Sequence, residues 1–194
     1  MIAIIPYFYN INLLVINLKM NSSIYLGGGC FWCIESIFKK VNGITFTSPG
    51  YMGGKSDNPT YEEVCEGYTN HVEVVELHYD QTIDLNQILN IFFTVHDPTS
   101  INRQGADVGT QYRSAIFCKP EERSSIVNFI QELEGQGIFK DKIVTEVNDI
   151  QKFFVAEDYH HDYFTKNPKN AYCRAVINPK LNKLRSSFSE LISE

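Results

Sequence analysis

Apolar residues recur at helical spacing in several stretches of the chain. Ile34, Ile37, Phe38 and Val41 lie three or four positions apart, as they would on one face of a helix. Asp84 and Gln87 are typical of a capped helix start, because each side chain can accept a hydrogen bond from the other residue's backbone N–H. These patterns predict helices over residues 31–41, 84–97, 120–134 and 156–165.

Short apolar or alternating runs between these helices predict strands. The clearest covers residues 71–79, and the others cover residues 24–26, 44–51, 111–118 and 143–150. A polar loop is expected over residues 100–109. Since strands and helices are mixed without strict alternation, we expect an α+β fold with a mixed sheet.

The first 20 residues are apolar but fit no single class of segment. No Lys or Arg precedes Lys19, which disfavours a signal peptide, and Pro6 interrupts any membrane span. We expect residues 1–20 to be an N-terminal extension, with the functional start near Met20, and residues 21–194 to form a single catalytic domain. Export or membrane attachment through residues 1–19 stays an alternative.

The composition narrows the range of partners. Of 194 residues, 43% are hydrophobic, and the net charge is -6 with dispersed acidic residues and no long basic run, so nucleic acid and stable membrane association are not expected. Five cysteines, an odd number, do not suggest a secreted disulfide framework. The odd number of cysteines fits reduced thiols better than disulfides, and we therefore expect a cytoplasmic protein. We expect no cofactor and no metal.

Cys30 follows three glycines and begins the first predicted helix. Unpaired N–H groups and the dipole at a helix N-terminus favour an anion, so we expect a lowered pKa and a reactive thiolate at Cys30. Phe31 and Trp32 place an apolar wall beside the sulfur. This arrangement suits an uncharged substrate with an apolar end.

Cys33 forms a Cys-x-x-Cys pair with Cys30. That pair alone also fits a general disulfide oxidoreductase or half of a zinc site, although zinc needs two further ligands. A cysteine nucleophile for acyl transfer is a weaker alternative, because no His stands out as its base.

Glu73 lies on the predicted strand 71–79, where side chains alternate between two faces. It shares a face with Val75, Leu77 and Tyr79, whereas Glu76 points the other way. Burial on an apolar face raises a carboxyl pKa, so Glu73 is a candidate general acid, with a solvated edge position as the alternative.

Several runs together resemble peptide methionine sulfoxide reductases of the A type. They follow the family's order within residues 24–185, and they are Gly-Cys-Phe-Trp-Cys-Ile-Glu (29–35), Gly-Tyr-Met-Gly-Gly (50–54), Pro-Thr-Tyr-Glu-Glu-Val-Cys (59–65), His-Val-Glu-Val-Val (71–75), His-Asp-Pro-Thr (96–99), Asn-Arg-Gln-Gly-Ala-Asp-Val-Gly-Thr-Gln-Tyr-Arg-Ser (102–114) and Ala-Glu-Asp-Tyr-His (156–160).

The resemblance implies repair of oxidised proteins by reduction of methionine S-sulfoxide, in proteins and as the free amino acid. It implies a two-layer α+β sandwich with a ferredoxin-like core. The implied site residues are the nucleophile Cys30, the acid Glu73, the oxygen-binding Tyr61 and Tyr112, the methyl-binding Phe31 and Trp32, and Asp107 in the pocket. It also implies thioredoxin as the reductant.

Resolution of the sulfenic acid on Cys30 requires a second thiol. Many family members have Gly at the position of Cys33 and use cysteines in a Gly-rich tail, which is not seen here. Cys33 is therefore the first candidate, and Cys173 the second if the C-terminal segment folds over the pocket. Cys65 and Cys118 are interpreted as core residues.

Three further residues carry weaker predictions. His160 lies on the predicted helix 156–165, near other His and Asp residues, and is interpreted as a surface, hydrogen-bonding residue rather than a metal ligand. Arg103 and Arg113 flank the loop that carries Asp107 and are predicted to orient it.

Overall fold

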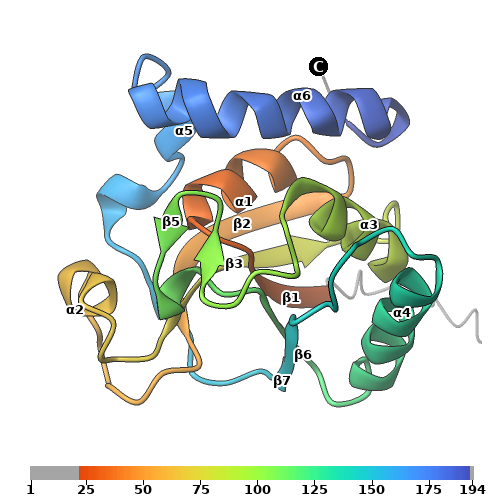
Figure 1. Cartoon of the computed structure of the whole chain (residues 1–194). Coiled ribbons are helices and arrows are strands. Elements are labelled where there is room, and N and C mark those ends of the chain that lie inside the picture. Colours follow the sequence, from red (N-terminus) through yellow and green to blue (C-terminus); the bar gives the residue numbers. More distant parts are fainter. Residues whose placement is uncertain (1–21, 193–194) are drawn as a thin grey trace, which may run out of the picture.

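Six strands form one mixed sheet at the centre of the molecule (Figure 1). The computed structural model describes residues 22–192, so the predicted extension over residues 1–20 lies outside the described residues. The strands lie in the order β7-β6-β1-β3-β2-β8. All neighbours are antiparallel except β6 and β7, which are parallel, so the predicted mixed sheet is confirmed. The strands are β1 (Ser22–Gly27), β2 (Ile44–Met52), β3 (Val72–Tyr79), β6 (Ala115–Cys118), β7 (Glu146–Asp149) and β8 (Phe154–Val155).

Two helices connect the four central strands. Helix α1 (Phe31–Phe38) joins β1 to β2, and helix α3 (Leu85–Val95) joins β3 to β6. The strand order β6-β1-β3-β2 interleaves these two split βαβ units, which is the ferredoxin-like arrangement. The predicted ferredoxin-like core is therefore confirmed.

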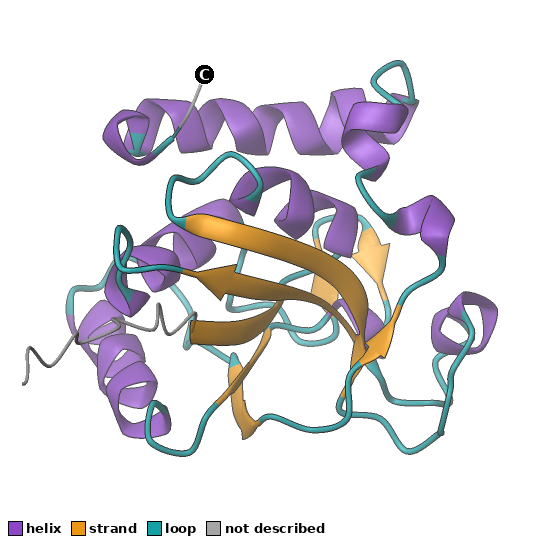
Figure 2. Cartoon of the chain, turned by 180° about the vertical axis from the view of Figure 1, so that it is seen from behind, coloured by secondary structure: helices purple, strands orange, loops and turns teal. Residues whose placement is uncertain are grey.

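The two faces of the sheet bury clusters of different size. Ile24 and Leu77 face the large cluster, which includes the apolar stripes of α1 and α3. The alternate positions Val72 and Val74 face a smaller cluster on the other side. Helix α6 (Asn178–Ser187) contacts both α1 and α3 and runs along the top of the molecule in Figure 1. The sheet and its helix layer form the predicted two-layer sandwich, to which α6 is added (Figure 2).

The predicted cap of α3 is confirmed. Asp84 accepts a hydrogen bond from the backbone N–H of Gln87, and the Gln87 side chain accepts one from the backbone N–H of Asp84. Other predicted boundaries move: α1 ends at Phe38, and the helix expected from residue 120 is α4 (Arg123–Gly135). No helix within residues 22–192 is long and apolar enough to cross a membrane.

Two predictions around residue 110 are wrong. The expected polar loop contains a small hairpin of β4 (Arg103–Gln104) and β5 (Asp107–Val108), turned by Gly105 at φ +61°. The expected strand 111–118 begins as the 3-10 helix η1 (Thr110–Tyr112), and only β6 is extended. Tyr112 therefore lies on a short helical turn and not on the sheet.

The predicted helix 156–165 is also wrong. It divides into η2 (Asp158–His160) and α5 (Tyr163–Lys166), because Asp162 takes a left-handed backbone with φ +55°. The N–H of Asp162 donates to Glu35 (2.9 Å), and its carboxylate pairs with Lys39 (2.9 Å). Contacts with α1 thus override the local helical pattern.

Two helical regions lie where none was expected. Helix α2 (Tyr61–Cys65) begins with a capping box formed by Thr60 and Glu63. The C-terminal region forms a π-helical turn, η3 (Cys173–Ile177), followed by α6 and the short η4 (Ser189–Leu191). Pro179 lies near the start of α6, directly after the π-helical turn η3.

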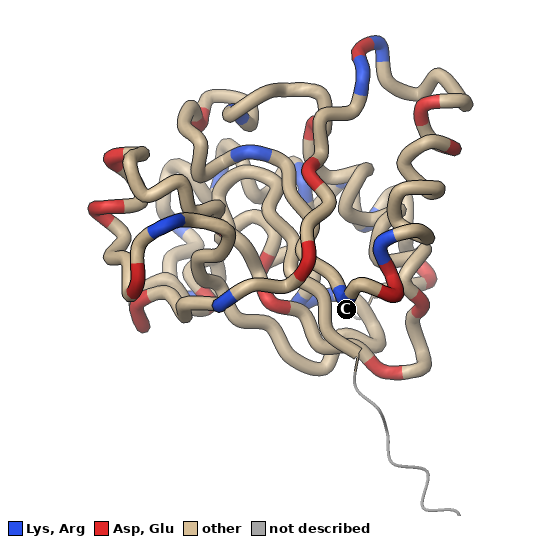
Figure 3. The backbone as a smooth tube through the Cα atoms, turned by 90° about the horizontal axis from the view of Figure 1, so that it is seen from below, with Lys and Arg blue, Asp and Glu red and all other residues tan. Residues whose placement is uncertain are grey.

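Charged residues of both signs are scattered over the backbone in the view of Figure 3. The exposed ion pairs Lys152–Asp57 and Arg123–Asp149 are examples. This dispersed pattern agrees with the sequence-based expectation.

Candidate active site

The thiol of Cys30 lies where β1 passes into α1, as predicted. Cys30 is the N-cap of α1 and is 8% exposed. The turn requires glycine: Gly29 has φ +90°, and a Cβ atom on Gly28 would meet the rings of Phe92 and His96. The glycines therefore fix where the thiol stands relative to the helix.

Glu73 lies directly beside this helix start. Its Oε2 accepts a hydrogen bond from the backbone N–H of Phe31 (3.0 Å), and the residue is only 1% exposed. Burial raises the pKa of its carboxyl to about 8, although the hydrogen bond from Phe31 opposes this. The predicted burial and raised pKa are confirmed, and Glu73 can hold a proton at neutral pH.

The thiol of Cys30 does not have the low pKa predicted from its position. Burial, a hydrogen bond with Cys33 and the charge of Glu73 raise the pKa of Cys30 well above its usual value. The same hydrogen bond lowers the pKa of Cys33 to about 7. At Cys30, burial therefore outweighs the effect of the helix N-terminus.

Two tyrosines approach Glu73 from different elements. Tyr61 is the first residue of α2, and Tyr112 is the last residue of η1. Burial raises the pKa of both hydroxyls, and the charge of Glu73 adds to this effect. The structure therefore brings both predicted tyrosines into electrostatic range of the buried acid, with their protons retained for donation.

Glu157 holds Tyr61 in this place and was not identified from the sequence. Its Oε1 accepts from the backbone N–H of Tyr61 (2.8 Å), and its Oε2 accepts from the hydroxyl of Tyr51 (2.8 Å). It belongs to the run 156–160, whose order in the family pattern was the only available signal.

The aromatic pair after Cys30 is held by His160. Trp32 stacks on Tyr163, with ring centroids 3.6 Å apart, and its Nε1 donates to Nδ1 of His160 (3.0 Å). Phe31 is 1% exposed and lies 4.8 Å from the ring of His160, between centroids. His160 is a hydrogen-bonding residue as predicted, but it is buried rather than at the surface, and burial lowers its pKa to about 4.

A pocket of about 300 Å³ opens beside the two thiols, between the β4–β5 hairpin and the C-terminal helical region. Its walls include Cys30, Cys33, Gln104, Asp107, Tyr172 and Lys180. Of the predicted pocket residues, this cavity contains Asp107 but neither Phe31 nor Trp32 in its lining.

Asp107 is oriented by Tyr172 and not by an arginine. The hydroxyl of Tyr172 donates to Oδ2 of Asp107 (2.6 Å), and the same hydroxyl lies 3.7 Å from Sγ of Cys33. Arg103 bonds instead to the carbonyl of Gly105. The prediction for the two arginines is therefore wrong, and Tyr172 was missed because it lies 65 residues from Asp107 in the sequence.

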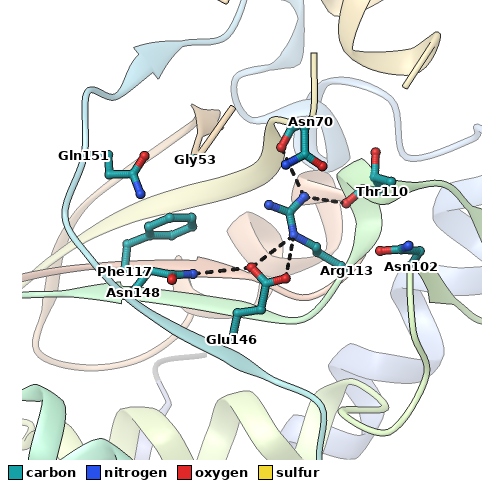
Figure 4. A pocket seen from close by; sticks show the side chains of 9 residues that line it. All are labelled: Gly53, Asn70, Asn102, Thr110, Arg113, Phe117, Glu146, Asn148 and Gln151. Atoms are coloured by element: carbon teal, nitrogen blue, oxygen red, sulfur yellow. Dashed lines mark hydrogen bonds and ion pairs between the residues drawn. The ribbon is translucent and has the colours of Figure 1, made fainter. Parts of the chain in front are cut away.

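Arg113 has a different role, which Figure 4 shows. Its guanidinium donates to the backbone carbonyls of Asn70 (3.2 Å) and Thr110 (2.9 Å) and to the carboxylate of Glu146 (3.2 Å). Asn70 lies just before β3, which carries Glu73. Arg113 thus ties the turn that carries Tyr112 to the strand that carries Glu73.

The remaining cysteines differ in exposure. Cys173 and Cys118 are buried, so the core prediction for Cys118 is confirmed, but Cys65 is exposed and its core prediction is wrong. Within residues 22–192, no group of three or more Cys, His, Asp or Glu side chains is placed to hold a metal ion.

Comparison with known proteins decides the family. The family model for peptide methionine sulfoxide reductase matches residues 22–192. The chain belongs to this family. Two curated relatives, both called peptide methionine sulfoxide reductase MsrA, agree over most of the chain. That of Haloquadratum walsbyi is 47% identical, covering 90% of this chain and all of the relative. That of Picrophilus torridus is 50% identical, covering 87% and 96%.

Solved structures give the same result for the fold. The reduced form of Mxr1 from Saccharomyces cerevisiae is similar with a TM-score of 0.74 and 34% identity, covering 80% of this chain and 90% of that one. Methionine sulfoxide reductase A of Corynebacterium diphtheriae has a TM-score of 0.68 and 36% identity, covering 77% and 76%. The chain is therefore an oxidoreductase of the peptide-methionine (S)-S-oxide reductase class, as the family resemblance implied.

Proposed function

We propose that this methionine sulfoxide reductase works through Cys30 as nucleophile and Glu73 as acid. The observation that carries the proposal is the hydrogen bond from the N–H of Phe31 to the buried Glu73, which holds a proton-bearing carboxyl beside the residue that follows Cys30. A nucleophile and an acid held by one helix start can act on the same sulfoxide group.

In the first step, sulfur of Cys30 attacks the sulfur of methionine S-sulfoxide while Glu73 protonates its oxygen. This attack forms an S–S bond; the hydroxyl group then moves from the substrate sulfur to the sulfur of Cys30 as the S–O and S–S bonds of the substrate sulfur break, so methionine leaves and Cys30 becomes a sulfenic acid. The substrate sulfur gains two electrons and Cys30 loses two. The proton of the Cys30 thiol returns Glu73 to its acid form, so the step balances.

Neighbouring side chains bind the parts of the substrate. Tyr61 and Tyr112 keep their hydroxyl protons and donate to the sulfoxide oxygen, because burial and Glu73 raise their pKa values. Trp32, held by Tyr163 and His160, offers a fixed apolar surface to the S-methyl group, with Phe31 behind it. The substrates are oxidised proteins and free methionine sulfoxide, and Asp107 lines the approach.

The second step closes a disulfide and the third reopens it. Cys33 is our candidate for the resolving thiol, because its thiol is hydrogen-bonded to that of Cys30. Cys173 is the alternative: it is buried in η3 and interacts electrostatically with Cys33. A dithiol protein, thioredoxin, then reduces the disulfide. The five free thiols fit a reducing compartment, and we propose the cytoplasm.

The roles of Cys30 and of the resolving thiol are tested separately. Cys30→Ser should abolish methionine formation from the S epimer with a dithiol reductant, whereas the matched control Cys118→Ser should retain it. Substantial activity in Cys30→Ser would overturn the nucleophile assignment. Peptide mapping after one turnover without reductant should find Cys30 linked to Cys33, and a Cys30–Cys173 link would transfer the resolving role to Cys173.

A further inference from the structure

The thiol of Cys33 has a polar contact with the C-terminal region. Cys33 is only 1% exposed, so most of its surface is covered by protein. Its Sγ lies 3.7 Å from the hydroxyl of Tyr172, and that hydroxyl donates to Asp107 (2.6 Å). In the arrangement in which Tyr172 donates its single hydroxyl proton to Asp107, the Cys33 thiol is the donor in its contact with Tyr172.

Cys33, Tyr172 and Asp107 form a row, and its far end, Asp107, reaches the surface. Asp107 lies on the β4–β5 hairpin and is partly exposed, and the pocket of about 300 Å³ runs along the same side chains. The three groups therefore form one directed chain of hydrogen bonds from a buried thiol to a carboxylate that water can reach.

We propose that Tyr172 and Asp107 carry the proton of Cys33 to solvent when Cys33 resolves the sulfenic acid on Cys30. Tyr172 is then the proton carrier of the second step, supplied by the C-terminal region that covers α1. This proposal rests on the proposed function, because it takes Cys30 as the oxidised residue and Cys33 as the resolving one.

The step balances in atoms and electrons. The thiol proton of Cys33 moves to the oxygen of Tyr172, as the hydroxyl proton of Tyr172 moves to Asp107 and from there to water. The Cys33 thiolate attacks the sulfur of the sulfenic acid, the S–O bond breaks, and hydroxide leaves and takes up a proton. The products are the Cys30–Cys33 disulfide and one water, without any added oxidant or reductant.

Charges around Cys33 fit the removal of its proton. The titratable groups that interact with it come from several elements and are Cys30, Glu73, Asp107, Tyr172, Cys173 and Lys180. The hydrogen bond with Cys30 is the largest effect that favours the thiolate and the charge of Lys180 adds to it, whereas burial and the charge of Asp107 oppose it. Protonation of Asp107 during the relay removes that opposing charge at the moment when the thiolate forms.

The test is Tyr172→Phe in a single turnover without reductant. This change removes one hydroxyl and keeps the ring that contacts the edge of Trp32. Two products are followed in the same sample: methionine released, and the thiols lost on disulfide formation. We expect one methionine per chain at the wild-type rate, followed by disulfide formation at least tenfold slower, with a sulfenic acid on Cys30 that a 1,3-diketone reagent traps.

Tyr25→Phe is the matched control, because it removes a hydroxyl that likewise donates to a carboxylate, that of Glu76, on the face of the sheet away from the two thiols. This control should close the disulfide at the wild-type rate. A Tyr172→Phe variant that closes it as fast as wild type would overturn the proposal, and so would an equal slowing of methionine release. Failure of the wild-type protein to release methionine would instead refute the proposed function.

The pH dependence separates a proton route from loss of packing. In Tyr172→Phe the proton must leave without the relay, so disulfide formation should rise with pH and approach the wild-type rate at about pH 9. A slowing that is the same from about pH 6 to about pH 9 would overturn the proposal. If Tyr172→Phe does not fold, Asp107→Asn tests the same route, because Asn cannot take up the proton of Tyr172. It should slow disulfide formation at least tenfold relative to methionine release, and an unchanged ratio of the two rates would overturn the proposal.

Discussion

Replacement of Glu73 by Gln is the change that bears most directly on the chemistry. Gln keeps the size of the side chain, and its carbonyl oxygen can still accept a hydrogen bond from the N–H of Phe31. Its amide group is not an acid, however, and cannot protonate the sulfoxide. With a pKa of about 8, the wild-type carboxyl is protonated roughly ten to one at pH 7. General acid catalysis contributes about 10²- to 10⁴-fold, so methionine release in Glu73→Gln should fall by that factor, or roughly 3 to 5 kcal/mol in barrier.

The pH dependence of the free energy of unfolding provides a second measure of the Glu73 carboxyl. Glu73 has its pKa raised from its ordinary value of 4.5 to about 8, so the unfolded chain ionises first as the pH rises. Wild-type stability should therefore fall between about pH 4.5 and about pH 8, by up to roughly 5 kcal/mol, and stay lowered above that range. Glu73→Gln should not show this loss, which urea unfolding at several pH values measures.

Single-turnover methionine release is the decisive assay, because it does not depend on the second step. Because ionisation of Cys30 supplies thiolate in both proteins as the pH rises, the ratio of the wild-type rate to the variant rate isolates Glu73, and this ratio should fall about tenfold per pH unit above about pH 8. A Glu73→Gln variant that releases methionine within about threefold of wild type at pH 7 would refute the reasoning, since acid catalysis contributes at least about 10²-fold. Near-equal pH dependence of stability in the two proteins would show that Glu73 is not buried as described.

Three further changes test how the site is held. Arg113→Met leaves two backbone carbonyls without their donor, so urea unfolding should show a loss of about 1–3 kcal/mol, and single-turnover methionine release should slow. Gly29→Ala places a Cβ against the side chain of Gln104 at φ +90°, and thermal unfolding should show a loss of about 1–3 kcal/mol. Asp84→Ala removes the cap of α3, and urea unfolding should show about 1 kcal/mol lost with methionine release unchanged.

Local sequence patterns were sufficient to predict the positions of the two site residues that depend on one helix start and one strand. Three glycines before an apolar helical stripe placed Cys30 at a helix start, and alternation along β3 placed Glu73 on the buried face. The direction of the Cys30 pKa shift was wrong, because the helix N-terminus is visible in the sequence whereas the amount of protein covering the thiol is not.

Contacts between distant segments explain the remaining differences. The run 156–165 has helical character, but its contacts with α1 hold Asp162 in a left-handed backbone. Tyr172 meets Asp107 and Cys33 only because the C-terminal region folds back over α1. The start of α2 was detectable from Thr60 and Glu63, since a capping box is a local signal.

The cover that α6 and the preceding turn place over α1 has a consequence during synthesis. Cys30 and Cys33 emerge early from the ribosome, but Tyr172 follows about 140 residues later, which at ordinary elongation rates is on the order of ten seconds. The central strand β1 also waits for β6 before it is paired on both sides. Until Tyr172 and α6 have been synthesised, the thiols of Cys30 and Cys33 lack this cover. An oxidant that reaches the nascent chain during that interval can therefore close the disulfide before the enzyme has folded.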